Sequence, residues 1–214
     1  MEAEMSERWS LWTRNVVDKY KNWSTDSIKR DLSRNASPFA VCMEHWQGDF
    51  NISTLIRNAN AFNAKEVFYF GKKRFDRRGT VGSHHYIHFT HLQRDISELV
   101  DLKSEYALVG IENNIPNTKK LGKFDWAELP KPPLFIFGEE GIGITKETLS
   151  IVDVCVEIPQ YGSVRSLNVG TSSGIIMYDF VQYLRNSKDP YNLPREKCDE
   201  ICNEQSESSQ LILL

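Results

Sequence analysis

The sequence predicts an α/β fold, built as a mainly parallel sheet flanked by helices. Short apolar runs of strand length alternate with segments whose apolar residues recur at helical spacing, which is typical of consecutive strand–helix–strand units. The 214 residues, 40% hydrophobic and 26% charged, suit one globular domain with an extension. No run approaches the roughly 18 apolar residues of a membrane span, so we expect no membrane partner.

Three regions are expected along the chain. They are a helical N-terminal extension over 1–36, the α/β domain over 37–187, and an acidic, partly mobile tail over 188–214. Apolar residues at three- and four-residue steps predict a helix over 9–20, and polar residues 24–26 offer N-caps for a second helix.

Strands and helices alternate in the α/β domain. Apolar runs predict strands over 39–43, 67–70, 86–89, 106–111, 134–137 and 154–158. Periodicity and capping residues predict helices that begin with Asn51 as N-cap, at residue 92, near Lys146 and near Asn168. Because parallel sheets bind ligands at the carboxyl ends of their strands, we expect function in the segments that follow the strands.

The N-terminus carries acids where a secretory signal has a basic start, so we expect a cytoplasmic protein. Cys198 and Cys202 lie four residues apart, with no histidine or further cysteine to complete a metal site. The histidines between 84 and 91 also lack a cysteine or carboxylate at ligand spacing. We therefore expect no metal.

The first candidate segment runs from Asn51 to Arg57 in an otherwise apolar helix. An arginine in this setting usually extends to solvent or pairs with a carboxylate. Its planar fork of donors would equally suit a phosphate. The segment alone favours the first interpretation, and the second stays open.

The second segment follows the predicted strand 134–137 and contains Gly138, Glu139, Glu140 and Gly143. Glycines allow a backbone to approach a ligand closely, although a plain turn would explain them as well. The glycine spacing differs from a dinucleotide fingerprint, and the acids would repel a pyrophosphate. A neutral or cationic ligand is therefore favoured over a phosphate.

The third segment follows the predicted strand 154–158. Pro159 and Gly162 fix a loop, and Ser166 or Asn168 can cap the last helix. Capping alone would explain one of these two polar residues.

In this order and spacing, the three segments resemble the SpoU (TrmH-like) branch of the SPOUT RNA methyltransferases, over about residues 38–185. The matching positions are Asn51 and Arg57, then Gly138, Glu140 and Gly143, then Ile158, Pro159, Ser166, Leu167, Asn168 and Val169. The departures are Asn63, where the family often has glycine, and Gly170, where serine or alanine is usual. Neither departure removes a catalytic group.

The resemblance implies a deep trefoil knot in the C-terminal half, an obligate homodimer, and S-adenosyl-L-methionine held bent by the knotted loops. The donor is cationic at sulfur, which suits the acids of the second segment. The residues that the resemblance assigns to the cofactor are Phe137, Gly138, Glu139, Gly143, Ile158, Pro159, Ser166, Leu167 and Asn168.

The implied activity is methylation of a ribose 2′-hydroxyl in RNA. The residues implied in catalysis are Arg57, Asn51, Glu140, Ser166 and Asn168. The resemblance gives Arg57 the role of base, but a free guanidinium keeps its proton above about pH 12. We expect Arg57 to clamp the phosphate beside the target ribose, while the proton leaves through that phosphate or a water. The other four would shape the pocket and hold Arg57 and the ribose.

A basic cluster after the strand 67–70 is the candidate RNA surface, despite a net charge of −3. Phe75 and the histidines at 84 and 85 add rings that could stack on bases. The residues expected to bind RNA are Lys72, Lys73, Arg74, Arg77, Arg78, His84 and Arg165. A solvated basic loop is the alternative.

The helical extension favours a transfer RNA, with the D-loop guanosine as target, because family members that act there carry such additions. Ribosomal RNA is the alternative substrate. A non-catalytic RNA-binding protein on the same fold should have lost Arg57 or the pair Ser166 and Asn168, which this chain keeps. A nucleotide-dependent oxidoreductase is disfavoured by the glycine spacing.

Overall fold

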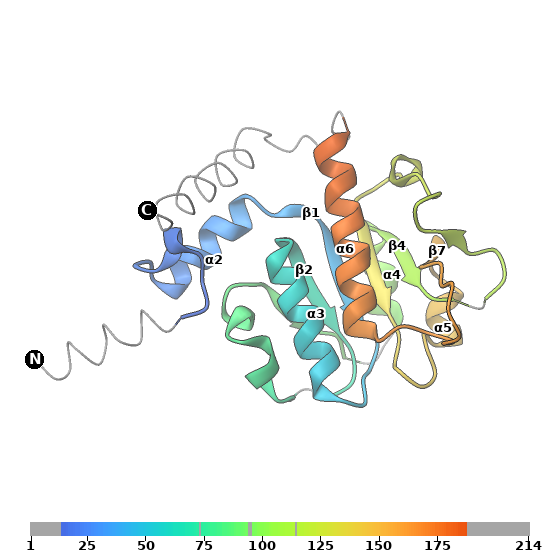
Figure 1. Ribbon diagram of the computed structural model, residues 1–214, viewed down its shortest axis with the longest axis horizontal. Helices are drawn as coiled ribbons and strands as arrows, with labels where there is room; N and C mark the ends of the chain where they lie inside the picture. The colour runs from blue at the N-terminus through green and yellow to red at the C-terminus, as the bar shows by residue number, and fades with distance from the viewer. Residues whose placement is uncertain (1–13, 73, 94–95, 114, 188–214) are drawn as a thin grey trace, which may run out of the picture.

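The computed structural model describes residues 14–72, 74–93, 96–113 and 115–187. These form a seven-stranded sheet in the order β3-β2-β1-β6-β4-β7-β5, in which every neighbouring pair is parallel (Figure 1). The strands are β1 (Ser37–Met43), β2 (Ala64–Tyr69), β3 (Phe89–His91), β4 (Ala107–Ile111), β5 (Lys119–Lys120), β6 (Pro133–Phe137) and β7 (Val154–Glu157). The predicted fold class is confirmed.

Helices cover both faces of this sheet, as a parallel sheet requires. The α-helices are α2 (Thr25–Arg34), α3 (Asp49–Ala61), α4 (Ile96–Leu102), α5 (Lys146–Leu149) and α6 (Val169–Asn186). Short 3-10 helices are η1 (Asp18–Tyr20), η2 (Arg77–Thr80), η3 (Ser83–His85) and η4 (Trp126–Glu128). Within the described residues, no helix has the length and hydrophobicity needed to cross a bilayer.

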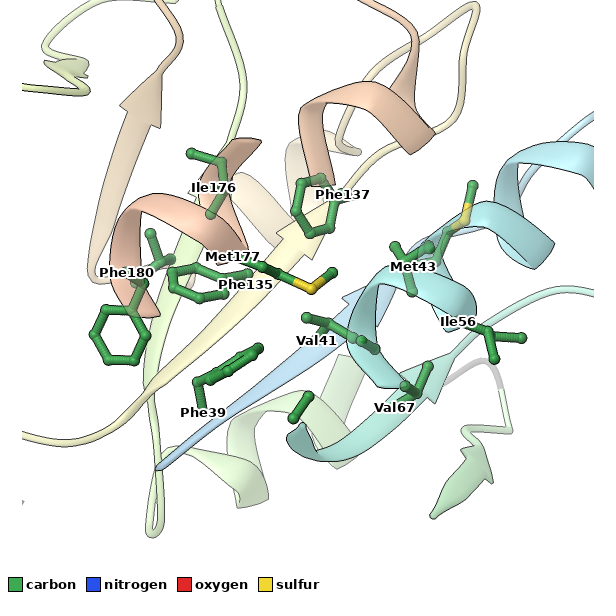
Figure 2. Packing of buried hydrophobic residues seen from close by; sticks show 14 of the residues in the cluster. Phe39, Val41, Met43, Ile56, Val67, Phe135, Phe137, Ile176, Met177 and Phe180 are labelled. Atoms are coloured by element: carbon green, nitrogen blue, oxygen red, sulfur yellow. The ribbon is translucent and has the colours of Figure 1, made fainter. Parts of the chain in front are cut away.

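The main core lies between the sheet and the pair α3 and α6, which run side by side in Figure 1. Figure 2 shows Phe39 of β1 and Phe135 of β6 directed toward α6, where Phe180 completes an aromatic cluster. The three ring centroids are 5.5 to 5.7 Å apart. Truncating one such fully buried phenylalanine costs about 3–5 kcal/mol.

The opposite face uses the alternate residues of the same strands. Ala40, Cys42, Leu134 and Ile136 form a second buried cluster with Leu99 of α4. Because successive strand residues point to opposite faces, runs that are apolar at every position fit a strand covered on both sides. This explains why β1, β4 and β6 read as continuous apolar runs in the sequence.

Three of the predicted element boundaries are wrong. Helix α3 begins at Asp49 with Gly48 as its N-cap, so Asn51 lies inside the helix and does not cap it. The predicted strand 86–89 is replaced by β3 at Phe89–His91, because the chain first forms the 3-10 turn η3. Helix α4 begins at Ile96 rather than at residue 92.

The N-terminal region confirms one predicted helix. In α2, the Ser24 side chain accepts a hydrogen bond from the amide of Ser27 at 3.2 Å, as an N-cap does. The described half of the other predicted helix contains only the 3-10 turn η1. Its remaining residues lie outside the described part of the chain, as does the predicted tail 188–214.

Candidate active site

The three sequence segments meet at the carboxyl edge of the sheet. They follow β1, β6 and β7, whose carboxyl ends lie on the same side because the strands are parallel. Asn168 is the N-cap of α6, and its side chain accepts from the amide of Thr171 at 3.2 Å. The predicted capping role of Asn168 is confirmed, and Ser166 lies exposed in the loop before it.

One hydrogen-bond chain links all three segments. Nδ2 of Asn168 donates to Oδ1 of Asn51 at 2.7 Å, and Nδ2 of Asn51 donates to Oε1 of Glu140. Asn51 is 8% exposed, so its amide is held with both polar ends satisfied. Residues from α3, the loop after β6 and the start of α6 are thereby fixed relative to one another.

The carboxylate of Glu140 is held in its charged form. Its second oxygen accepts from the amide of Gln47 at 3.0 Å. Burial raises the pKa of Glu140, but hydrogen bonds from Asn51 and from the amides of Gln47 and Gly48 outweigh it, so the pKa is lowered from 4.5. A fixed negative charge therefore lies where a cationic ligand would be favoured.

The glycines after β6 are required by a tight turn. Glu139 and Gly143 exchange two backbone hydrogen bonds, of 2.8 and 3.2 Å. A Cβ on Gly138 would overlap the backbone of Gly143 and Ile144, and a Cβ on Gly143 would overlap the Glu112 carboxylate. Gly143 also has a φ of +76°, which side chains rarely adopt. The plain-turn interpretation thus explains both glycines without a ligand.

The loop from 158 to 168 leaves polar groups open. Neither the amide of Gln160 nor that of Leu167 forms a backbone hydrogen bond with any described residue. The side-chain oxygen Oε1 of Gln160 is buried without a partner among the described residues, and such orphan atoms normally mark a missing ligand or water. These open groups follow β7 and the anionic Glu140 follows β6, both at the carboxyl edge of the sheet, and together they fit a polar, partly cationic cofactor such as S-adenosyl-L-methionine.

The other residues expected to hold the cofactor lie in the 158–168 loop and at the end of β6. Ile158, Pro159 and Leu167 are half-buried in the 158–168 loop. Phe137 is fully buried in β6, and its carbonyl accepts from the amide of Glu44 at 2.8 Å. Phe137 therefore fixes the end of β6, from which the turn begins. The half-buried Glu139 accepts a hydrogen bond from Nε2 of Gln47 at 2.5 Å.

Arg57 lies apart from this network. Its side chain is exposed on α3, and the guanidinium forms no hydrogen bond or ion pair with any described residue. Asn51 and Arg57 are six residues apart, which places them roughly 120° apart around a helix. Neither Asn51 nor Glu140 contacts the guanidinium in this structure, so their expected role in holding Arg57 stays a prediction, and Arg57 is open to an anionic ligand.

The basic cluster lies beyond β2, and its exposed members are Lys72, Arg74, Arg77 and Arg78. Arg78 is bound by Asp76 through Nε at 2.8 Å, which reduces its freedom to contact a phosphate. Phe75, expected to stack on bases, is half-buried and packs against Trp46 and Phe89, with the Arg77 guanidinium 5.9 Å from its ring centre. Lys73 lies outside the described residues, and Arg165 is exposed in the 158–168 loop.

Two supporting residues were missed from the sequence. Gln47 holds both acids of the second segment, and Glu112 accepts from the amides of Ile144 and Asn113 at 3.0 and 2.9 Å. Glu112 directly follows β4 and Gln47 lies in the loop between β1 and α3, where polar residues of a ligand-binding edge are found, but neither belongs to a recognisable motif. No group of three potential metal ligands is present among the described residues.

Two curated proteins are similar to this chain over most of its length. The tRNA (guanosine(18)-2'-O)-methyltransferase of Aquifex aeolicus is 26% identical over 179 residues, which cover 81% of this chain and 82% of that enzyme. The enzyme of the same name from Escherichia coli strain K12 is 29% identical over 73% of this chain and 68% of its own length.

Solved structures share the fold. The Aquifex aeolicus TrmH/SpoU tRNA modifying enzyme superposes with a TM-score of 0.66 at 22% identity, over 86% of this chain and 95% of that chain. The SpoU methyltransferase AviRb from Streptomyces viridochromogenes, in complex with AdoMet, gives 0.62 at 22% identity, over 72% of this chain and 60% of its own.

A family match covers most of the α/β domain. Residues 38–178 match the SpoU rRNA Methylase family, and this range contains Asn51, Arg57, Glu140 and Asn168. With two thirds of its residues inside that match, the chain belongs to the SpoU rRNA methylase family.

Proposed function

We propose that this chain methylates a transfer RNA at the ribose of a D-loop guanosine. The coarser statement rests on the family: the chain is an S-adenosyl-L-methionine-dependent RNA 2′-O-ribose methyltransferase. The finer substrate is supported by relatives from Aquifex aeolicus and Escherichia coli that carry this activity in their names. A cytoplasmic site of action is part of the same proposal.

The observation that carries the proposed site is the hydrogen-bond chain from Asn168 through Asn51 to Glu140. It joins the three family motifs at the edge of the sheet where parallel α/β proteins bind ligands. Backbone groups of 158–168 and the turn after β6 would hold the cofactor, which supplies an electrophilic methyl group when bound. Ser166 is exposed beside this network and would contact the cofactor or the ribose.

In the proposed reaction, the chain aligns a ribose hydroxyl and assists loss of its proton. Arg57 would bind the phosphate beside the target ribose through its planar fork of donors. Because a guanidinium is a poor base, the proton would leave through that phosphate or a water. The Arg57 side chain is exposed and has no partner among the described residues, so it is available to bind a substrate phosphate.

A homodimer is proposed on the distribution of exposed apolar side chains. Phe50, Ile142, Tyr161 and Val164 are 61–95% exposed, and all lie on elements at the carboxyl edge. Phe50 and Arg57 are seven residues apart, so they share one face of α3. Exposed apolar residues concentrated at one end of a molecule mark an interaction surface. A second copy there would cover them and would bring its own surface close to Arg57.

The test is transfer of radiolabelled methyl groups to unmodified transfer RNA and to ribosomal RNA fragments. Alkaline-hydrolysis mapping then locates the 2′-O-methylated nucleotide. Methylation of one D-loop guanosine supports the proposal. Methylation of ribosomal RNA alone would replace the substrate, and methylation of neither RNA would leave the finer proposal without support.

A further inference from the structure

A cavity lies between the N-terminal segment and the η2–η3 region. It has a volume of about 330 Å³ and is lined by Arg14, Thr25, Val81, Gly82, His85 and Tyr86. This volume falls at the lower end of the roughly 300–1,000 Å³ typical of small-molecule sites. The cavity is separate from the Asn51 network, because no residue of that network lines it.

One wall of the cavity is held rigidly. Nε and Nη2 of Arg14 donate to the Tyr86 hydroxyl at 3.2 and 3.1 Å, and Nη1 donates to the carbonyl of Trp23 at 2.8 Å. The guanidinium also lies 5.7 Å from the centre of the Tyr86 ring. A guanidinium fixed in this way presents a flat, charged surface, which is a stacking platform for nucleic-acid bases.

A second wall carries an exposed imidazole. The His85 ring packs on the His84 ring with 4.0 Å between centroids. The Thr80 hydroxyl holds His84 in place, since it lies 2.6 Å from Nδ1 of that ring. The same hydroxyl donates to the Arg77 carbonyl. Burial, together with His85 and Arg77, lowers the pKa of His84. His85 is thus the ring that lines the cavity, and His84, which is expected to bind RNA, is half-buried beside it.

Val81 forms a third wall of the cavity, and its backbone is strained there. Its φ of +50° lies in the left-handed region, which a β-branched residue rarely adopts. The side chain is nonetheless 46% exposed, so core packing does not explain why valine stands there. Backbone strain of this kind concentrates at binding sites.

The cavity is connected to the helix face that bears Arg57. Ser53 and Arg57 are four residues apart on α3 and therefore share a face. The Ser53 hydroxyl donates to the carbonyl of Asp76 at 2.9 Å, and a Cβ on Gly79 would come within 2.8 Å of the Ser53 Cβ. The η2 segment thus begins beside Ser53, one helical turn before Arg57, and leads to Val81 at the cavity, on the side of α3 away from α6 (Figure 1).

From this arrangement we propose that the cavity receives one unstacked base of the RNA substrate, from a nucleotide near the methylated one. The base would stack against His85 and the Arg14 guanidinium, with Val81 as the apolar wall. The inference rests on the proposed function, because it requires an RNA substrate at Arg57. It assigns a role to the contact between the N-terminal segment and the α/β domain.

The experiment measures the affinity of the full chain for unmodified transfer RNA transcripts, each lacking one base in a D-loop position. For the wild-type chain, one missing base should weaken binding about 10-fold, as expected for the loss of one stacked base. In His85→Ala the same missing base should weaken binding no further, because the base and His85 form one contact and their losses are not additive. His88→Ala, an exposed histidine outside the cavity, should keep the wild-type response.

A second variant separates an effect on RNA binding from an effect on folding. Val81→Gly should keep or raise the melting temperature by relieving the left-handed backbone, yet weaken RNA binding several-fold. Asn117→Gly is its matched control, since Asn117 is exposed with a φ of +63° outside the cavity, and it should leave RNA affinity unchanged.

The proposal is overturned if every missing base weakens the wild-type and His85→Ala chains equally, or if Val81→Gly retains full RNA affinity. If the wild-type chain neither binds nor methylates the transcript, the proposed substrate fails as well. If the wild-type chain methylates the transcript but no missing base shows coupling to His85, only the proposal about the cavity is overturned.

Discussion

The side-chain amide of Asn168 donates to Oδ1 of Asn51 at 2.7 Å while its own Oδ1 caps helix α6. One residue thus performs two separable tasks, and Asn168→Asp separates them. Aspartate keeps the capping oxygen but loses the donor toward Asn51. We predict a change in unfolding free energy within about 1 kcal/mol and a fall in methyl-transfer rate of roughly 10- to 100-fold. Chemical denaturation and single-turnover kinetics provide the two readouts, and an unchanged rate would contradict the role of the link.

Arg57 should matter for turnover and not for stability. Since it is exposed without a described partner, Arg57→Ala and Arg57→Lys should change the unfolding free energy by no more than about 0.5 kcal/mol. Loss of a donor that stabilises the transition state costs roughly 10²- to 10³-fold in rate. Lysine should not restore the rate, because it lacks the planar fork. An Arg57→Lys chain with near-wild-type single-turnover kinetics would eliminate the phosphate clamp.

Gly138 should be intolerant of any side chain. In Gly138→Ala the new Cβ would overlap the backbone of Gly143 and Ile144, so we predict a loss of at least about 3 kcal/mol in unfolding free energy. Gly162→Ala is the matched control, because nothing lies within 4 Å of a Cβ there, and it should change stability by no more than about 0.5 kcal/mol. Urea midpoints decide between them, and equal midpoints would contradict the packing of the turn.

Glu140 makes a contribution to stability that depends on pH. Burial raises its pKa, but the hydrogen bonds from Asn51 and backbone amides prevail and lower it from 4.5. A carboxyl with a lower pKa in the folded state stabilises the fold above its unfolded pKa, and this stabilisation is lost as pH falls through the folded pKa. The stability difference between wild type and Glu140→Gln should therefore be constant above about pH 5 and shrink below about pH 4.5.

Denaturation of both chains between about pH 3 and 7 measures this difference. Glu128→Gln, at an exposed position of η4, serves as the control and should differ little from wild type throughout. A wild-type advantage over Glu140→Gln that does not change with pH would contradict the charged network.

The basic cluster should determine the salt dependence of RNA binding. Replacing Lys72, Arg74 and Arg77 with alanine should weaken binding and reduce the slope of log K against log salt by roughly 0.7–0.9 for each phosphate that the variant no longer neutralises. Cofactor affinity should be unchanged. Lys119→Ala with Lys120→Ala, on the opposite edge strand β5, is the control with two charges removed. If the control and the cluster variant give equal slopes, the cluster is not an RNA surface.

Much of the fold followed from the sequence because strands buried on both faces leave continuous apolar runs. β1, β4, β6 and β7 were predicted within one or two residues of their ends. β5 was missed, because its two exposed lysines carry no apolar signal and pair only with β7. The trefoil knot that accompanies the family could come only from the resemblance, since local pattern carries no information on how loops thread.

The site was predictable where motifs were involved and less so where tertiary contacts decide. Asn51 was assigned as an N-cap from residue preference, but the chain enters α3 through Gly48, which frees the Asn51 amide to join Asn168 and Glu140. Glu112 was missed because its role depends on the turn at Gly143, which is distant in sequence. Phe75 was assigned to base stacking, although the sequence could not reveal its packing on Trp46.

Titration calorimetry of the purified full chain with S-adenosylhomocysteine tests the central claim most directly, because every role assigned to the carboxyl edge requires the methyl donor to bind there. The account predicts saturable binding with at most one site per chain, and clearly weaker binding in Asn168→Asp. Absence of binding heat, together with an unchanged melting temperature at millimolar ligand, would contradict it.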